Sequence, residues 1–292
     1  MISDQAQHLR EFMKRRQNDQ QRKPTRVLAV TSGKGGVGKS NFTINFGLSL
    51  VELGQKVVII DLDLGMANIN ILLGLTPRYS MMDLIDRDLT IWEIMEQGPR
   101  GIEFISGGSG FHDVLRLDEQ KLNTLLAEME KLHGYADVIL LDLGAGISGE
   151  SLRFILAADE VILISTPEPT AITDAYSLLK IAHGHHAAVV TKLIVNRVQS
   201  YREGEQVAKK IEMVANQFLN YQLETLGYIE EDRHVLQAVK KQRPFCLEYP
   251  NSKVSKGLRE MAKGFMSGHS PQLQAAGGMK AFIHRLTQFG RR

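Results

Sequence analysis

The sequence predicts an α/β fold in which helices cover both faces of a doubly wound, mostly parallel β-sheet. Short β-branched apolar runs alternate along the chain with longer segments of helical spacing, and the runs at 57–60 and 138–141 are apolar at every position. A strand without alternation between apolar and polar residues is buried on both faces, as in parallel sheets covered by helices. The alternation of strands and helices then indicates a succession of βαβ units.

The expected strands and helices follow one another in order along the chain. Strands are identified as short runs rich in β-branched residues, and helices as segments with apolar residues three and four positions apart. The expected strands are 26–31, 56–61, 102–106, 136–142, 160–165, 189–195 and 224–229. The expected helices are 39–53, 118–132, 170–182, 206–219, 234–240, 253–265 and 279–289.

Composition limits the classes of protein that the chain can represent. The 292 residues are 43% hydrophobic and 23% charged, which excludes collagen-like and largely disordered proteins. Cys246 is the single cysteine, so an internal disulfide or an iron–sulfur cluster held by one chain is excluded. No apolar run approaches the roughly 20 residues needed to cross a bilayer. We therefore expect a globular protein of the reducing cytoplasm.

Charge is distributed unevenly along the chain, although the net charge is only +2. Residues 1–26 carry seven Lys/Arg and three Asp/Glu, and residues 267–292 carry four Lys/Arg and no Asp/Glu. This leaves 24 basic and 30 acidic residues for the segment between them. Non-specific binding of nucleic acid needs a basic folded surface, so we expect no direct nucleic-acid partner. Basic tails instead suit protein docking or an anionic membrane surface.

Four regions are expected from these patterns. A flexible segment at 1–23 precedes one folded domain at 24–266. A linker at 267–278, rich in Gly, Ser, Pro, Gln and Ala, then separates this domain from a terminal amphipathic segment at 279–292.

A phosphate-binding loop is expected directly after the first strand. Residues 33–40 have the spacing G-x-x-x-x-G-K-[ST] and lead into a helix. The glycines let backbone N–H groups point at phosphate oxygens, Lys39 supplies charge to the β- and γ-phosphates, and the Ser40 hydroxyl can ligate Mg²⁺. We therefore expect ATP or ADP with Mg²⁺ as the ligand. The loop residues of the expected site are Gly33, Lys34, Gly35, Gly36, Val37, Gly38, Lys39 and Ser40.

Carboxylates follow two of the expected strands. Asp61 and Asp63 are two positions apart and lie on one face of a strand end, where they can hold Mg²⁺ through water and orient an attacking water molecule. Asp142 ends another strand after four apolar residues, as expected of an acid that contacts Mg²⁺ through water. The expected metal site therefore comprises Ser40, Asp61 and Asp142.

The string at 34–40 resembles the deviant Walker A motif of the MinD/ParA ATPases, and the resemblance covers residues 24–266. It implies a MinD-like P-loop ATPase that is a homodimer with ATP and a monomer otherwise. It also implies that Lys34 reaches across the dimer to the partner's phosphates, and that Asp63 positions water. The catalytic residues would be Lys34, Asp61, Asp63 and Asp142. Gly144 departs from the family, which usually has proline at this position.

Two further positions have roles implied by the same resemblance. Asn196, followed by Arg197, lies where the family has its adenine-recognising asparagine, although an Asn at a strand end is also a common turn residue. Glu168 opens a helix where the family has part of its dimer surface, but an acid there is equally explained by the helix dipole.

The C-terminal segment has a narrow apolar stripe with basic residues on its other faces. The stripe resembles the membrane-targeting sequence of MinD proteins and has the chemistry to lie in an anionic membrane interface. A helix docked on the core is the alternative, and both arrangements can occur in turn. The stripe consists of Met279, Phe282, Ile283, Leu286 and Phe289.

The N-terminal segment carries a second motif, D-Q-A-x-x-L-R. It resembles the activator motif of the FlhG (YlxH/FleN) family, MinD-like ATPases that control flagellar number and placement. The resemblance implies stimulation of the GTPase FlhF, with Gln5 or Gln7 as the active side chain, and a flagellar C-ring protein as another partner. The motif residues are Asp4, Gln5, Ala6, Gln7, Leu9 and Arg10.

The function expected from these features is that of a slow Mg²⁺-dependent ATPase switch that regulates flagella. It would be cytoplasmic and would bind the inner face of the cell membrane when ATP is bound. Four alternatives remain: a ParA-type DNA-partition ATPase, a MinD-type division-site ATPase, an Mrp-like cluster carrier and a nucleotide-gated scaffold. The acidic core disfavours the first, and the lone cysteine disfavours the cluster carrier.

Overall fold

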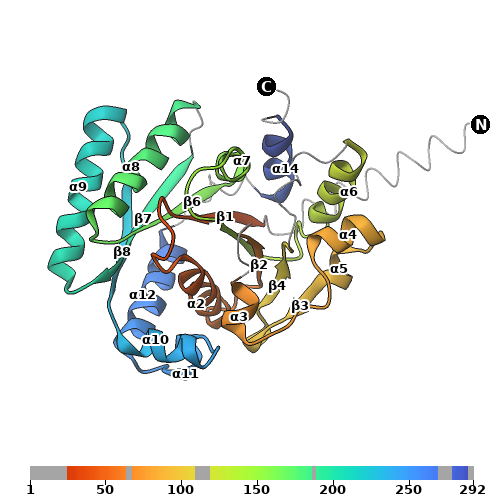
Figure 1. Ribbon diagram of the computed structural model, residues 1–292, viewed down its shortest axis with the longest axis horizontal. Coiled ribbons are helices and arrows are strands. Elements are labelled where there is room, and N and C mark those ends of the chain that lie inside the picture. The colour runs from red at the N-terminus through yellow and green to blue at the C-terminus, as the bar shows by residue number, and fades with distance from the viewer. Residues whose placement is uncertain (1–24, 64–67, 109–118, 186–188, 269–277, 289–292) are drawn as a thin grey trace, which may run out of the picture.

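The computed structural model describes residues 25–63, 68–108, 119–185, 189–268 and 278–288. One eight-stranded sheet forms its centre (Figure 1). The strands are β1 (Arg26–Thr31), β2 (Val57–Leu62), β3 (Met95–Gln97), β4 (Glu103–Ser106), β5 (Val138–Leu143), β6 (Glu160–Ser165), β7 (Val190–Val198) and β8 (Glu224–Glu230). Their order is β3-β4-β2-β5-β1-β6-β7-β8, and every pair is parallel except β3 with β4. The expected doubly wound α/β fold is confirmed.

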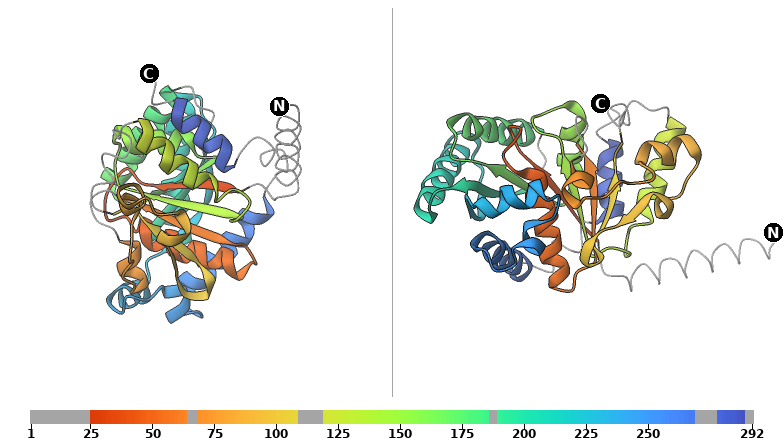
Figure 2. Two further views of the ribbon diagram at one scale, coloured as in Figure 1. Left: turned by 90° about the vertical axis from the view of Figure 1, so that its right-hand side faces the viewer. Right: turned by 60° about the horizontal axis from the view of Figure 1, so that its bottom comes forward.

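Helices cover both faces of the sheet, as Figure 2 shows. Every residue of β1, β2, β5 and β6 is buried, which explains their uninterrupted apolar runs. One core cluster packs α2 (Lys39–Glu52), α3 (Ile69–Leu73), α10 (Arg233–Lys240), α11 (Phe245–Glu248) and α12 (Lys253–Ser267) on one face. The other packs α4 (Met81–Arg87), α5 (Ile91–Ile94), α6 (Glu119–Glu130), α7 (Gly149–Ala157), α8 (Pro169–Gly184), α9 (Tyr201–Leu219) and α14 (Met279–Gln288). A 3₁₀ turn, η1 (Pro99–Gly101), precedes β4.

Helix α14 lies against α6 and α7 in the second layer (Figure 1). Met279 and Phe282 are completely buried, Leu286 is 3% exposed, and Ile283 packs partly buried against the same core. Protein therefore covers the apolar stripe, which is the docked arrangement that the sequence left open. Phe289 lies outside the described residues.

Several sequence predictions fall outside the described part of the chain. These are the motif at 4–10 and the rest of the segment 1–23, together with 269–277 of the linker. Among the residues that the structure describes, no helix has the length and apolar character needed to cross a membrane.

Candidate functional site

The loop between β1 and α2 lies where the sheet changes winding direction, because β1 pairs with β5 on one side and β6 on the other. Ligands of doubly wound folds bind at this switch point. Gly36 and Gly38 have positive φ angles of 77° and 95°, which side chains disfavour. A Cβ at Gly38 would also lie 2.5 Å from Nδ2 of Asn196. Glycine is therefore required where α2 begins.

Lys39 lies among oxygen atoms at the start of α2. Its Nζ is 3.0 Å from Asp142 Oδ1 and 3.7 Å from Asp63 Oδ2, and its side chain is 6% exposed. Ser40 Oγ donates a hydrogen bond to the other carboxylate oxygen of Asp142 at 2.6 Å, and Thr43 Oγ1 donates to Oδ1 at 2.8 Å. The structure therefore brings together the predicted Lys39, Ser40, Asp63 and Asp142, and adds Thr43.

Asp61 completes this group because strand register places it beside Asp142. It is 3% exposed, and its carboxylate accepts hydrogen bonds from the backbone N–H groups of Asp63, Asn68 and Ile69 at 3.1–3.2 Å. Burial, and then the negative charge of Asp142, raise the pKa of Asp61 to about 7. The carboxyl therefore links the phosphate site to the start of α3 and titrates near neutrality.

The oxygen atoms around Ser40, Asp61 and Asp142 suit Mg²⁺, which prefers hard oxygen ligands. Within the described ranges, no three His, Cys, Asp or Glu side chains form a metal cluster of their own. Mg²⁺ commonly binds through one or two carboxylates together with substrate phosphates and water. The hydroxyl and carboxylates fit a metal ion that arrives with a nucleotide.

Lys34 lies apart from this group, at the exposed rim of the loop. Its Nζ is 2.6 Å from Glu168 Oε2 and donates a hydrogen bond to Thr170 Oγ1 at 3.0 Å. Glu168 is the N-cap residue of α8, and the hydrogen bond and charge of Lys34 lower the pKa of the Glu168 carboxyl. Both sides of this ion pair are substantially exposed, so Lys34 is accessible to a partner.

A cavity of about 420 Å³ adjoins the loop. Asn196 lines it from the end of β7, donating a hydrogen bond from Nδ2 to the carbonyl of Val37 at 2.7 Å. Arg197 lines it as well and has a positive φ of 57° at a bulge of β7. Val235, Leu236 and Val239 of α10 add an apolar wall that motif analysis did not identify. The cavity has the apolar surface and amide group that a nucleobase needs.

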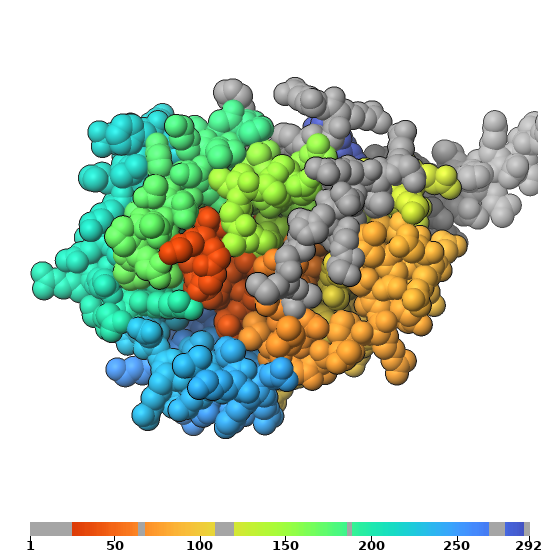
Figure 3. Space-filling view, in the orientation of Figure 1, coloured from red at the N-terminus to blue at the C-terminus, as the bar shows by residue number. Residues whose placement is uncertain are grey.

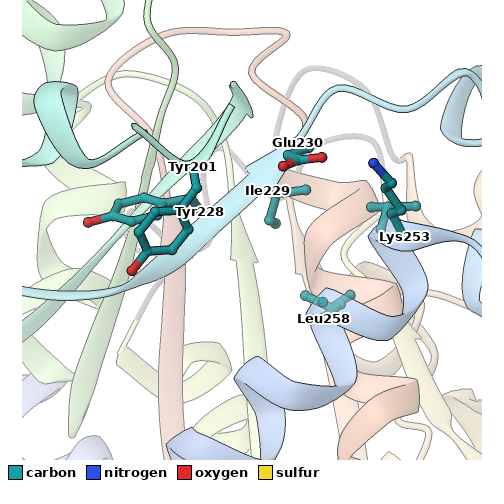
Figure 4. A pocket seen from close by; sticks show the side chains of 8 residues that line it. Tyr201, Tyr228, Ile229, Glu230, Lys253 and Leu258 are labelled. Carbon is teal, nitrogen blue, oxygen red and sulfur yellow. The ribbon is translucent and has the colours of Figure 1, made fainter. Parts of the chain in front are cut away.

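The phosphate loop lies at the surface of the molecule, where Figure 3 shows it in red beside α8 in green and above α10 in blue. A second cavity, of about 360 Å³, shares Ile229, Glu230 and Val254 with the first. In Figure 4, Tyr201 and Tyr228 border it on one side and Lys253 and Leu258 of α12 on the other. None of the residues predicted for the site lines this second cavity.

Comparison with known proteins agrees with this geometry. A ParA family model, described as NUBPL iron-transfer P-loop NTPase, matches residues 23–266. Antiactivator FleN of Pseudomonas aeruginosa PAO1 is 35% identical over 91% of this chain and 94% of its own length. The flagellum site-determining protein YlxH of Helicobacter pylori is 30% identical over 91% of this chain and 90% of its own length.

Solved structures show the same fold. MinD of Pyrococcus horikoshii, complexed with Mg-ADP, has a TM-score of 0.69 and 25% identity, covering 84% of this chain and 98% of that one. A chain of the MinC:MinD cell division complex of Aquifex aeolicus has a TM-score of 0.67 and 26% identity, covering 84% and 97%. The phosphate loop, its second lysine and these similarities lead to one assignment. The chain belongs to the ParA/MinD family of P-loop NTPases, in the group that includes FleN and YlxH.

Proposed function

We propose that this protein is an ATP-dependent switch that dimerises, associates with the membrane and regulates the number and placement of flagella. Its relatives are called antiactivator FleN and flagellum site-determining protein YlxH. One observation carries the switch: Lys39 is buried among carboxylates, whereas Lys34 of the same loop lies at the exposed rim. The protein acts in the cytoplasm and, with ATP bound, at the inner face of the cell membrane.

ATP is the substrate, and the residues around Lys39 hydrolyse it. Lys39 exchanges its carboxylate partners for the β- and γ-phosphates. Ser40, Asp61 and Asp142 would hold Mg²⁺, which would supply positive charge next to the phosphate oxygens. Asp63 orients the attacking water molecule. The short distances among these groups support this assignment, because catalysis of phosphoryl transfer consists mainly of positioning and charge stabilisation.

Lys34 acts in trans within an ATP-bound homodimer. Its ion pair with Glu168 holds it on the rim, from which it moves to the phosphates of the partner chain. An exposed ion pair contributes little free energy, so the phosphates compete for Lys34 effectively. Hydrolysis removes the γ-phosphate and returns the protein to the monomer.

Helix α14 provides the membrane contact. In the monomer its apolar face is buried against α6 and α7, and in the ATP-bound dimer it leaves this position and lies in the anionic interface. A single short helix binds a membrane weakly, but two helices of one dimer bind together. Membrane attachment therefore follows the nucleotide state.

The protein acts on two partner proteins. The motif at 4–10 stimulates the GTPase FlhF, and a flagellar C-ring protein binds the folded domain. Ile181 of α8 and Met213 and Phe218 of α9 are exposed apolar side chains, and each is a candidate contact for that partner. Phe218 packs edge-on against Tyr176, with ring centroids 6.5 Å apart. Exposed aromatic and methionine side chains of this kind are enriched at protein interfaces.

Liposome co-sedimentation tests the proposed switch. The full chain and a truncation ending at Gly278 are each incubated with anionic liposomes, Mg²⁺ and either ADP or a non-hydrolysable ATP analogue. We expect only the full chain with the analogue to sediment. If neither nucleotide brings the full chain to liposomes, α14 is a structural helix, and a DNA-partition or soluble-scaffold function is favoured instead.

A further inference from the structure

Polar contacts hold α14 in addition to its apolar face. Arg285 Nε donates to the carbonyl oxygen of Ala157 at 2.7 Å, and a terminal nitrogen of the same guanidinium donates to Asp159 Oδ1 at 2.7 Å. The N–H of Gly278, directly before the helix, donates to the Asp159 carboxylate at 3.0 Å. Ala157 is the last residue of α7, and Asp159 lies two residues beyond it. The C-terminal end of α7 therefore binds both the start and the last turn of α14.

The middle of α7 forms part of the apolar surface against which α14 packs. The rings of Phe154 and Phe282 stack with centroids 6.3 Å apart and planes inclined by 24°. Phe282 is completely buried, and Figure 1 shows the two helices side by side. Because close-packed interiors tolerate little displacement, a movement of Phe154 removes contacts from α14.

The N-terminal end of α7 begins at the nucleotide site. Asp142 is the second-last residue of β5, and the loop after this strand leads to Ser148, whose side chain caps α7 by accepting a hydrogen bond from the N–H of Ser151. Within this loop, the N–H of Gly146 donates to the carbonyl of Ser32 at 2.9 Å. Ser32 directly precedes the phosphate loop. The first turn of α7 is therefore connected to the phosphate loop and to the carboxylate expected near Mg²⁺.

The far end of α7 is fixed to the sheet. The N–H of Asp159 donates to the carbonyl of Val27 in β1 at 2.9 Å, and the N–H of Val27 donates to Asp159 Oδ2 at 2.9 Å. A shift of the loop at the other end consequently tilts α7 about Asp159 instead of translating it. Phe154 lies between the two ends and moves with the tilt.

We infer that α7 is a lever that couples the nucleotide site to α14. A shift of the loop between Asp142 and Ser148 tilts α7 and moves Phe154 away from Phe282. This removes apolar contacts that α7 makes with α14 and weakens the hold of the remaining contacts, which come from α6 and from the hydrogen bonds of Arg285 and Gly278. The helix is then released. This inference rests on the proposed membrane switch and describes its internal regulation.

Hydrogen–deuterium exchange on the full chain tests the lever, with Mg-ADP and with a non-hydrolysable ATP analogue plus Mg²⁺. In the wild type we expect the analogue to accelerate amide exchange in the first turn of α7 and in α14 together. Arg285→Lys keeps the positive charge but loses the planar two-point contact. With Mg-ADP bound, the amides of α14 should exchange about tenfold faster in this variant than in the wild type, because a hydrogen bond to a charged group is lost. The amides of α7 should stay protected. Lys280→Arg, an exposed and equally conservative change on α14, is the control and should behave as the wild type.

If the analogue accelerates exchange in α14 but not in the first turn of α7, another element releases the helix. The proposed coupling through α7 is then wrong, although the membrane switch stands. If Arg285→Lys leaves α14 as protected as in the wild type, the polar fastening to α7 is wrong. If α14 stays protected with both nucleotides and the full chain also fails to sediment with liposomes, the proposed membrane switch itself is wrong.

Discussion

Lys34 binds Glu168 and Thr170 of its own chain, whereas the proposed function requires it to reach a second chain. Lys34→Ala should therefore lower the ATP hydrolysis rate by roughly 10³-fold or more, as loss of a charged finger does in related phosphoryl transfers. Nucleotide binding should persist because Lys39 and the loop N–H groups remain. Steady-state phosphate release and binding of a fluorescent ATP analogue measure the two effects.

Lys131→Ala is a matched control for this prediction. Lys131 is also exposed and also forms an ion pair, with Glu128, but it lies far from the phosphate loop in the sequence. We expect the Lys131→Ala variant to hydrolyse ATP at the same rate as the wild type. Normal turnover in Lys34→Ala would show that hydrolysis proceeds without a lysine from the partner chain.

Asp61 predicts a pH dependence of stability in the nucleotide-free protein. Its pKa rises from an ordinary 3.8 to about 7 on folding, so the folded state binds the extra proton in this range. The extra proton stabilises the folded state, and this stabilisation is fully present below about pH 4. It is lost as pH rises from about 4 toward 7, and the free energy of unfolding then falls by at most about 1.4 kcal/mol per pH unit. Asp61→Asn cannot titrate and should lack this loss.

Urea unfolding at pH 5 and pH 8 measures the effect. Asparagine accepts fewer hydrogen bonds than the carboxylate, so the variant can be less stable than the wild type at pH 5. From pH 5 to pH 8, the difference in unfolding free energy should nevertheless shift in favour of Asp61→Asn. A difference that is the same at both pH values would mean that Asp61 does not carry the raised pKa.

At the scale of elements, buried strands were predictable and short elements were not. β1 and β6 agree with the sequence prediction at both ends, because a continuous apolar run marks a strand buried on both faces. No pattern in the sequence indicated α3, α5, α11 and β3, which have three to five residues and are too short to show a period. The longer helices α4 and α7 were not expected either, although each has a capping box at its N-terminus.

Some residues of the candidate site could likewise be predicted from the sequence, and others could not. Asp61 and Asp142 could be expected to meet because each lies one residue before the end of a buried parallel strand, and the register places them side by side. Thr43 could not, because its hydroxyl reaches a carboxylate 99 positions away by virtue of the packing of α2. The apolar wall from α10 likewise depends on how that helix packs beside the loop. Motifs therefore predict the phosphate-binding residues, and tertiary packing determines the cavity that we propose for the nucleobase.

The N-terminal motif is an element whose proposed activity can be measured without the folded domain's chemistry. The full chain should stimulate GTP hydrolysis by FlhF. One of the two variants Gln5→Ala and Gln7→Ala should lose this stimulation, because we propose that the amide side chain of one of these residues orients the attacking water. Gln17→Ala, in the same segment but outside the motif, is the control. Undiminished stimulation by both variants would remove the proposed activator role.

The two parts of the proposed switch, the phosphate loop and α14, occupy different places on the fold. The phosphate loop and its carboxylates lie at one end of the parallel strands, and α14 lies in the layer formed by α6 and α7 on one face. Its bound position buries the apolar residues that a membrane would otherwise contact. Under the proposed function, membrane binding therefore requires both release of the helix and a second copy, because one short helix gives only weak attachment.

Mixed dimers test that requirement. Full chain is combined with increasing amounts of the truncation ending at Gly278, with the ATP analogue and total protein held constant. Two helices on one dimer should bind liposomes about 10²- to 10⁴-fold more tightly than one. The amount of full chain that sediments should then fall with the square of its share of the total protein, since only dimers with two helices attach. The same truncation carrying Lys39→Ala, which cannot bind nucleotide and so cannot dimerise, should leave the sedimented fraction of full chain unchanged. A linear fall would mean that each helix attaches independently, and that dimerisation controls release of α14 but not the strength of attachment.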